Sequence, residues 1–352
     1  MFSAFEWMMA LRYLRARRQE GFISVIAWFS LLGIMLGVAT LIIVMSVMNG
    51  FRQELLTRIL GVNGHLSVYS DSEKLSNYDA LALRVQKIDG VVKVTPMIEG
   101  QVMASANGQA KGAIVRGLRQ QDVQQRTILA ENILQGSINE LTGNNAVMLG
   151  SRMARNLGLR IGDKITLISP KGNVTAFGTV PRMKAYKVAA IFNVGMHEYD
   201  SSFIFMPLSA AQVYFKLKGA VSYLDVVIKD PDRAPSMARD VWIKLGNIGR
   251  VYDWQRTNSS FFNAIQIERN VMFLILTMII VVAAFNVISS LIMLVKDKGR
   301  DIAILRTMGA TRGMIMRVFL ISGASVGVIG TIAGFALGLA FAENIETIRQ
   351  WL

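Results

Sequence analysis

The chain has 352 residues, of which 52% are hydrophobic, and its mean hydropathy is +0.40. This composition is too apolar for an ordinary soluble protein, and the apolar residues are clustered, so we expect a membrane protein with at least one polar domain. The net charge of +14 includes no basic block with interleaved aromatic residues, so we do not expect nucleic acid as a partner. The sequence contains no cysteine, which excludes disulfides and thiolate metal sites.

Segment 1–20 has an amphipathic pattern over residues 4–18, which predicts an interfacial helix on the cytoplasmic surface of a membrane. Residues 21–50 follow without a charge. As a helix this run is about 45 Å long, against about 30 Å for the hydrocarbon core, so it predicts a first transmembrane span. Several arginines precede it, so the positive-inside rule places the N-terminus in the cytoplasm.

Residues 51–267 have the composition of a soluble domain and alternate β-type runs with helical patterns. We therefore expect a large α+β periplasmic domain. Predicted strands cover residues 65–70, 91–95, 102–105, 113–116, 164–168, 186–192, 203–206 and 224–228. Predicted helices cover residues 77–87, 151–156, 209–216, 234–245 and the chain from residue 256 onward.

One connection inside this domain is unusually long. Residues 169–184 separate two predicted strands by about sixteen residues, where a hairpin loop usually has two to five. The segment contains prolines and glycines, which are typical of loops. Its length favours a projecting, hook-like functional loop over a floppy one.

Two further apolar runs follow the domain. Residues 268–295 predict a second span that returns the chain to the cytoplasm, and residues 317–342 predict a third. Glycines four residues apart in the third run indicate tight packing on a neighbouring helix. Residues 343–352 are then expected at a periplasmic end, without a fourth span.

Segment 296–316 is short and charged, lies between two spans, and is interpreted as a lever. Ile302, Leu305 and Met308 recur at helical spacing, Gly309 can end that helix, and Thr311 can cap the next one. The basic residues are typical of a cytoplasmic loop. Spacing alone leaves open whether the segment docks a soluble partner or only fixes topology and contacts anionic lipid.

The sequence shows no pattern for catalysis. His65 and His197 are isolated and lack metal-ligand spacing, and no nucleophile elbow occurs. No G-x-x-x-x-G-K-[ST] loop occurs either, so any nucleotide energy must come from another polypeptide. We therefore expect a non-catalytic protein without a cofactor of its own.

Three stretches carry a resemblance to a known family. They are Met48–Phe51 with Glu54–Leu55, Ala283–Leu291, and Ile302–Ala310. On these stretches the sequence resembles the transmembrane subunits of lipoprotein-releasing ABC transporters, the LolC/LolE type within the MacB/FtsX-like superfamily. The similarity covers essentially the whole chain. The third stretch is shared across the superfamily, whereas the first two, joined to this topology, point more narrowly to lipoprotein release.

The resemblance implies a multi-pass subunit of a Gram-negative inner membrane with several partners. These are an ABC ATPase of the LolD type, which binds the ATP and Mg, a second identical or paralogous permease subunit, lipoprotein substrates, and a periplasmic chaperone of the LolA type. ATPase coupling is expected at Asp297, Arg300, Ile302, Leu305, Arg306, Met308 and Gly309. A lipoprotein cavity is expected at Met45, Met48, Phe51, Phe261, Phe262 and Ile265. A chaperone hook is expected at Pro170, Gly178, Pro181 and Arg182.

Several alternatives stay open. Family members carry a fourth span, so we expect either a truncated chain or a fourth helix supplied otherwise. The hook-like loop favours the LolC role, but a LolE role or a hybrid subunit that forms a homodimer stays open. Competing functions are an efflux subunit of the MacB kind, a subunit of the FtsX kind that controls a wall hydrolase, and a membrane receptor with a periplasmic sensing domain.

Overall fold

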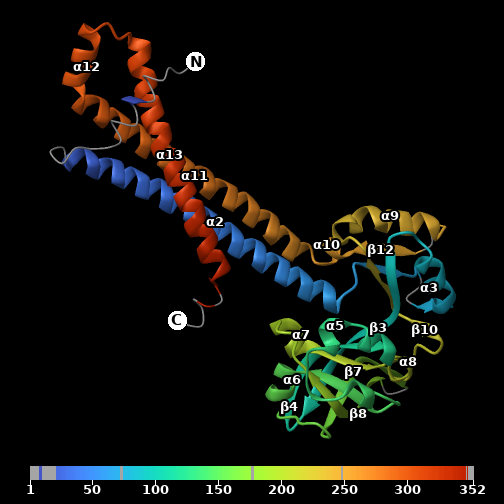
Figure 1. Cartoon of the computed structure of the whole chain (residues 1–352). Helices are drawn as coiled ribbons and strands as arrows, with labels where there is room; N and C mark the ends of the chain where they lie inside the picture. Colours follow the sequence, from blue (N-terminus) through green and yellow to red (C-terminus); the bar gives the residue numbers. More distant parts are fainter. Residues whose placement is uncertain are drawn as a thin grey trace. The chain divides into compact units, whose positions relative to one another are not determined.

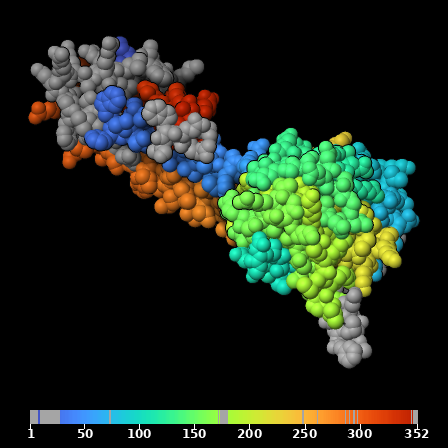
Figure 2. Space-filling view, turned by 90° about the horizontal axis from the view of Figure 1, so that it is seen from below, coloured from blue at the N-terminus to red at the C-terminus, as the bar shows by residue number. Residues whose placement is uncertain are grey.

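The computed structural model describes residues 8–9, 21–71, 74–175, 178–246, 249–345 and 347. The chain divides into two compact units, one made of residues 1–53 and 263–352 and the other of residues 54–262. Figure 1 draws their helices and strands, and Figure 2 shows one face of each unit. Of the predicted interfacial helix over residues 4–18, Met8 and Met9 are described and helical, and the rest lies outside the described residues.

Long helices dominate the first unit. They are α2 (Gly21–Val62), α11 (Ser259–Asp297) and α13 (Arg312–Glu343), with the short α12 (Gly299–Thr307) before α13. Among the described residues, three helical stretches are long and apolar enough to cross a membrane: Trp28–Val62, Phe262–Met293 and Arg312–Glu343. Helix α2 runs past the predicted end of the first span at residue 50, because Leu56, Ile59 and Leu60 continue the apolar helical spacing.

Helix α13 packs closely against α2, and Figure 1 shows the two helices crossing. Gly330, Gly334 and Gly338 are buried on this side of α13. A Cβ atom added to Gly334 would lie 2.5 Å from the carbonyl oxygen of Met35, and one added to Gly330 would lie 3.1 Å from Cβ of Ile34. The predicted tight packing of the third apolar run is confirmed, because only glycine lets the two backbones approach this closely.

The second unit holds the strands. They are β1 (Leu66–Tyr69), β2 (Leu75–Ser76), β3 (Val91–Ala106), β4 (Gln109–Leu118), β5 (Ile133–Gly136), β6 (Ala146–Gly150), β7 (Lys164–Thr175), β8 (Gly178–Phe192), β9 (Phe203–Pro207), β10 (Ala220–Val221), β11 (Tyr223–Ile228) and β12 (Arg250–Asp253). Its α-helices are α3 (Tyr78–Gln86), α4 (Gln120–Gln124), α5 (Thr127–Ala130), α6 (Ser151–Asn156), α7 (His197–Ser202), α8 (Leu208–Tyr214), α9 (Ala234–Lys244) and α10 (Trp254–Thr257).

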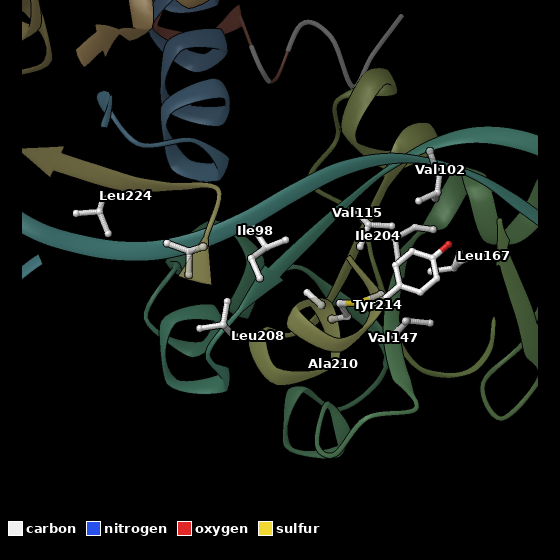
Figure 3. Packing of buried hydrophobic residues seen from close by; sticks show 14 of the residues in the cluster. Ile98, Val102, Val115, Val147, Leu167, Ile204, Leu208, Ala210, Tyr214 and Leu224 are labelled. Atoms are coloured by element: carbon white, nitrogen blue, oxygen red, sulfur yellow. The ribbon is translucent and has the colours of Figure 1, made fainter. Parts of the chain in front are cut away.

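Six of these strands close into a barrel. β3 pairs with β4, β4 with β9, β9 with β6, β6 with β8, β8 with β7, and β7 pairs back with β3. Alternate residues of the six strands are buried in one hydrophobic cluster, which fixes the register. The members are Val102, Ala104, Ala113, Val115, Val147, Leu149, Ile165, Leu167, Tyr186, Val188, Ile204 and Met206. Figure 3 shows several of them around Tyr214 of α8, so the interior is a packed core.

A second sheet and a second core complete the unit. β11 pairs with the first half of β3, β1 with β11, and β12 with β1. A separate hydrophobic cluster covers the opposite face of the barrel strands, where the rings of Phe192 and Phe205 lie 5.3 Å apart. α5 and α7 contribute Leu129 and Tyr199 to this cluster. The long strand β3 therefore belongs to both sheets and joins them.

Most predicted strands and helices of this unit are confirmed to within a few residues at their ends, whereas β3, β7 and β8 are longer than predicted. Two predicted strands, 91–95 and 102–105, are parts of the single strand β3, because Pro96 lies within the ladder opposite Leu224 instead of breaking it. β2, β5, β6, β10 and β12 were not predicted. Strand β5 lies at the edge of the sheet, and the runs of β5, β6 and β12 are each four or five residues long.

The predicted long loop over residues 169–184 is wrong, because the segment continues β7 and β8 as a hairpin. Ser169 pairs with Arg182, and Thr175 pairs with Gly178. The register shifts between Ser169 and Asn173, so the residues typical of a loop, Pro170 and Gly172, occupy an irregularity within the ladder. The turn at residues 176–177 lies outside the described residues. The hook-like feature is thus an extended two-stranded arm.

Candidate functional site

The segment between α11 and α13 has the local structure that its sequence predicts. α12 ends at Thr307, and Gly309 follows with a φ of +97°, a conformation that favours glycine. Thr311 begins α13 as its N-cap, and its hydroxyl accepts a hydrogen bond from the backbone N–H of Met314 over 3.3 Å. The predicted helix, break and capped restart are all confirmed.

α12 presents apolar and basic side chains together at its surface. Ile304 and Met308 are 58% and 79% exposed, and Arg300 and Arg306 are exposed beside them. Large exposed apolar residues rimmed by charge mark surfaces that bind other proteins or membranes. Ile304 is an exposed apolar residue of α12 that was not among the predicted ATPase-coupling residues. The side chain of Asp297 lies outside the described residues.

The other side of this segment is tied to α13. Ile302 and Leu305 are half-buried. Leu305 lines a small apolar pocket at the corner between α12 and α13, together with Met9, Ala310, Met314, Ile315, Val318 and Phe319. Leu305 therefore packs α12 against the start of α13.

The six residues predicted to line a lipoprotein cavity have different surroundings. Met45 and Phe51 of α2 are exposed, and Met48 is half-buried. Phe262 packs on Trp254, with ring centroids 6.0 Å apart, and so belongs to the core of the second unit. Ile265 is buried. The side chain of Phe261 lies outside the described residues.

The β7–β8 arm borders an open groove on the outer face of the barrel. The groove has a volume of about 620 Å³ and is lined mainly by Gln101, Met103, Gly112, Ile114, Ile168, Pro170 and Pro181. Pro170 and Pro181 are exposed. The guanidinium of Arg182 donates a hydrogen bond to the carbonyl oxygen of Tyr214, which fastens the arm to α8. Gly178 pairs with Thr175 in the ladder.

Val180 and Met183 are the exposed apolar residues of the arm that the sequence reading missed, at 55% and 64% exposure. Met183 lies on the side of β8 opposite to Tyr186 and Val188, which face the core, so assigning residues 178–184 to a strand would have predicted its exposure. Val180 shares the side of Tyr186 and is exposed nonetheless, so the alternation does not reveal it. Pro170 and Pro181 of the arm line the groove beside it.

Comparison with known proteins identifies two matching families. Residues 27–242 match the MacB-like periplasmic core domain, and residues 273–351 match the FtsX-like permease C-terminal domain. Over 358 residues the chain is 35% identical to the lipoprotein-releasing system transmembrane protein LolC of Neisseria meningitidis serogroup B, covering 99% of this chain and 84% of that protein.

Two other proteins are also similar to this chain. The lipoprotein-releasing system transmembrane protein LolE of Haemophilus influenzae is 29% identical, over 96% of this chain and 82% of that protein. The crystal structure of the periplasmic region of MacB from Actinobacillus actinomycetemcomitans has 13% identity and a TM-score of 0.38, covering 56% of this chain and 92% of that chain. By the near full-length match to LolC and the two family domains, the chain belongs to the LolC/LolE family of MacB/FtsX-like membrane permeases with a periplasmic domain.

Proposed function

We propose that this chain is the non-catalytic transmembrane subunit of an ATP-driven complex that extracts lipoproteins from the outer leaflet of the inner membrane and hands them to a periplasmic chaperone. The near full-length similarity to LolC carries this proposal. A separate ATPase of the LolD type supplies the energy, because the chain has no phosphate-binding loop of its own.

Coupling to that ATPase falls on α12. Its exposed Ile304, Arg306 and Met308 offer an apolar and basic surface to a partner with an acidic rim and an apolar centre. The arrangement needs the segment in the cytoplasm, which agrees with its positive charge. The N-terminus then also lies in the cytoplasm and the second unit in the periplasm.

The proposal assigns lipoprotein entry to the apolar ends of the spans. Met45 and Phe51 are exposed near the end of the apolar part of α2, where acyl chains would find a dry surface. Most large apolar side chains of α11 are also exposed, and their orange atoms lie at the surface in Figure 2. Lipid or a second permease subunit, identical or paralogous, covers them in the membrane.

The proposal assigns transfer of the lipoprotein to the chaperone to the β7–β8 arm and the groove beside it. Both strands of the arm are held by backbone pairing, and Arg182 ties its base to α8. A rigid arm that carries exposed Val180 and Met183 presents apolar surface at low entropic cost, which favours docking of a chaperone of the LolA type.

The proposal is tested in proteoliposomes that hold the complete complex and a labelled lipoprotein. Arg306→Glu is expected to abolish lipoprotein-stimulated ATP hydrolysis and ATP-dependent release, because it reverses charge on the docking surface while Arg306 contributes nothing to the core. Lys244→Glu, on the exposed end of α9, is the matched control and keeps both activities. Unchanged hydrolysis and release in Arg306→Glu would contradict the assignment of α12.

A second function rests on the same family domains. Matches to the MacB-like and FtsX-like domains are compatible with an efflux subunit or a subunit that controls a wall hydrolase. In either case α12 keeps its role, and the partner at the β7–β8 arm changes. The partner captured by the arm therefore separates the two functions.

A further inference from the structure

Two buried arginines hold the C-terminal end of α2 inside the second unit. The guanidinium of Arg126 donates to the carbonyl oxygen of Val62, the last residue of the helix, over 2.6 Å, and Arg116 donates to the same oxygen over 3.3 Å. All three residues are buried. The last carbonyls of a helix lack partners within the helix, and cations there also meet the negative end of the helix dipole.

Each arginine has an acidic partner on another strand. Arg126 forms an ion pair with Asp225 of β11, and Arg116 donates from Nε to Glu99 of β3 over 2.7 Å. The second carboxylate oxygen of Asp225 accepts the backbone N–H of Gly64 over 2.9 Å. β3, β4, β11 and the start of α5 therefore converge on one helix end through charge-assisted hydrogen bonds.

The residues beside Val62 are also fixed. Asn63 donates from its side chain to the carbonyl oxygen of Ile59 and to the hydroxyl of Tyr199. A Cβ atom on Gly64 would lie 2.4 Å from Oδ1 of Asp225, so the carboxylate fills the space beside this glycine. The backbone N–H of His65 then donates to the carbonyl oxygen of Val226 over 2.8 Å. The chain passes from helix to strand without a loosely held residue that could act as a hinge.

We propose that Arg116 and Arg126 are positioning residues that make this junction a rigid joint. A tilt or rotation of α2 then turns the barrel as one body instead of being absorbed where the helix ends. Buried ion pairs are weak contributors to net stability compared with apolar replacements, so the role that the proposal gives these two pairs is to fix the geometry of the junction. The proposal rests on the proposed function, in which α2 is one of the spans that the ATPase moves.

The joint is tested in the complete complex with the double variant Arg126→Met with Asp225→Asn. This variant removes both charges together, so no unpaired charge is buried, and the new amide oxygen can still accept the Gly64 N–H. Because the chain contains no cysteine, single cysteines at Thr57 of α2 and Lys111 of β4, both exposed, allow two spin labels to be attached. The distance distribution between the labels and the lipoprotein released per ATP hydrolysed are then measured.

The unsubstituted complex is expected to give a narrow distance distribution, and the double variant a broad one with a several-fold lower ratio of release to hydrolysis. The exposed Arg119–Asp79 ion pair supplies the control, since Arg119→Met with Asp79→Asn should change neither quantity. The proposal is overturned if the distance distribution stays narrow in the double variant. It is also overturned if the distance distribution broadens while the ratio of release to hydrolysis is unchanged.

A second variant keeps the proposal testable if the double variant fails to fold. Arg116→Lys keeps a positive charge beside Glu99 but loses the planar fork that reaches Val62, so it should broaden the distribution in the same direction. An unchanged distribution there also overturns the proposal. If the unsubstituted complex hydrolyses ATP but releases no lipoprotein, the proposed function fails, whereas the distance distributions still decide whether the arginines hold the joint.

Discussion

At the scale of single residues, His65 makes the second unit sensitive to acid. Its side chain is buried, and Nδ1 accepts the backbone N–H of Ile228 over 3.0 Å, so the ring must be unprotonated at that nitrogen. Burial lowers the pKa of His65 below its ordinary value of 6.5, although the nearby charge of Asp225 acts in the opposite direction.

Acidification is therefore expected to destabilise this unit. Because the folded pKa lies below the unfolded one, the unfolded chain takes up the proton first, and the free energy of unfolding falls as pH drops below 6.5 toward the folded pKa. His65→Gln should flatten this dependence, whereas His197→Gln, at the other histidine, which is exposed, should not. The check is the thermal unfolding midpoint of the purified chain between neutral and mildly acidic pH. An equally steep fall in His65→Gln would contradict the explanation.

The buried charge cluster around Val62 is a residue-scale feature that the sequence alone does not reveal. Arg126 lies 64 positions from Val62 and 99 from Asp225, and neither arginine belongs to a recognisable motif. Local patterns report neighbours within a few residues, so partners that only the barrel brings together leave no local signal. The capped corner at Thr311 is the opposite case, because every contact that forms it lies within a few residues.

At the scale of elements, the glycines of α13 allow a matched test of helix packing. Gly334→Ala places a methyl group 2.5 Å from the carbonyl oxygen of Met35, so α13 and α2 must separate. Overpacking of this kind typically costs about 1–3 kcal/mol. Gly327→Ala on the same helix meets no atom within 4 Å and serves as the control. The thermal unfolding midpoint in detergent should fall only in Gly334→Ala, and equal midpoints would contradict the packing.

Element types were largely predictable from sequence, and the exceptions have physical causes. Alternating apolar residues mark the barrel strands, because one side of each faces the core. The β7–β8 arm lacks that signal in its outer part, since it extends beyond the core, and Pro170 and Gly172 there are typical of a loop. Helix α2 continues beyond residue 50, where the first span was predicted to end, for a different reason: a span is bounded by charge, whereas a helix continues while its apolar spacing continues.

At the scale of the whole molecule, the proposed function gives the two units different tasks in one cycle. In that proposal α12 and the capped start of α13 receive movement from an ATPase, and the glycines of α13, which pack closely on α2, pass it on. α2 runs as one helix from Gly21 to Val62, where the buried arginines hold its end. The barrel carries the β7–β8 arm, to which the proposed function assigns the partner that receives the lipoprotein.

The most direct test of this account is photo-crosslinking in intact cells from a reactive amino acid at Pro181, with the captured protein identified by mass spectrometry. The same probe at Ile243, which is exposed on α9, is the control. If the arm hands lipoproteins over, Pro181, and not Ile243, captures a small soluble periplasmic carrier of lipoproteins. Capture of a wall hydrolase or an efflux adaptor at Pro181, or of no protein while the ATPase still copurifies, would contradict it.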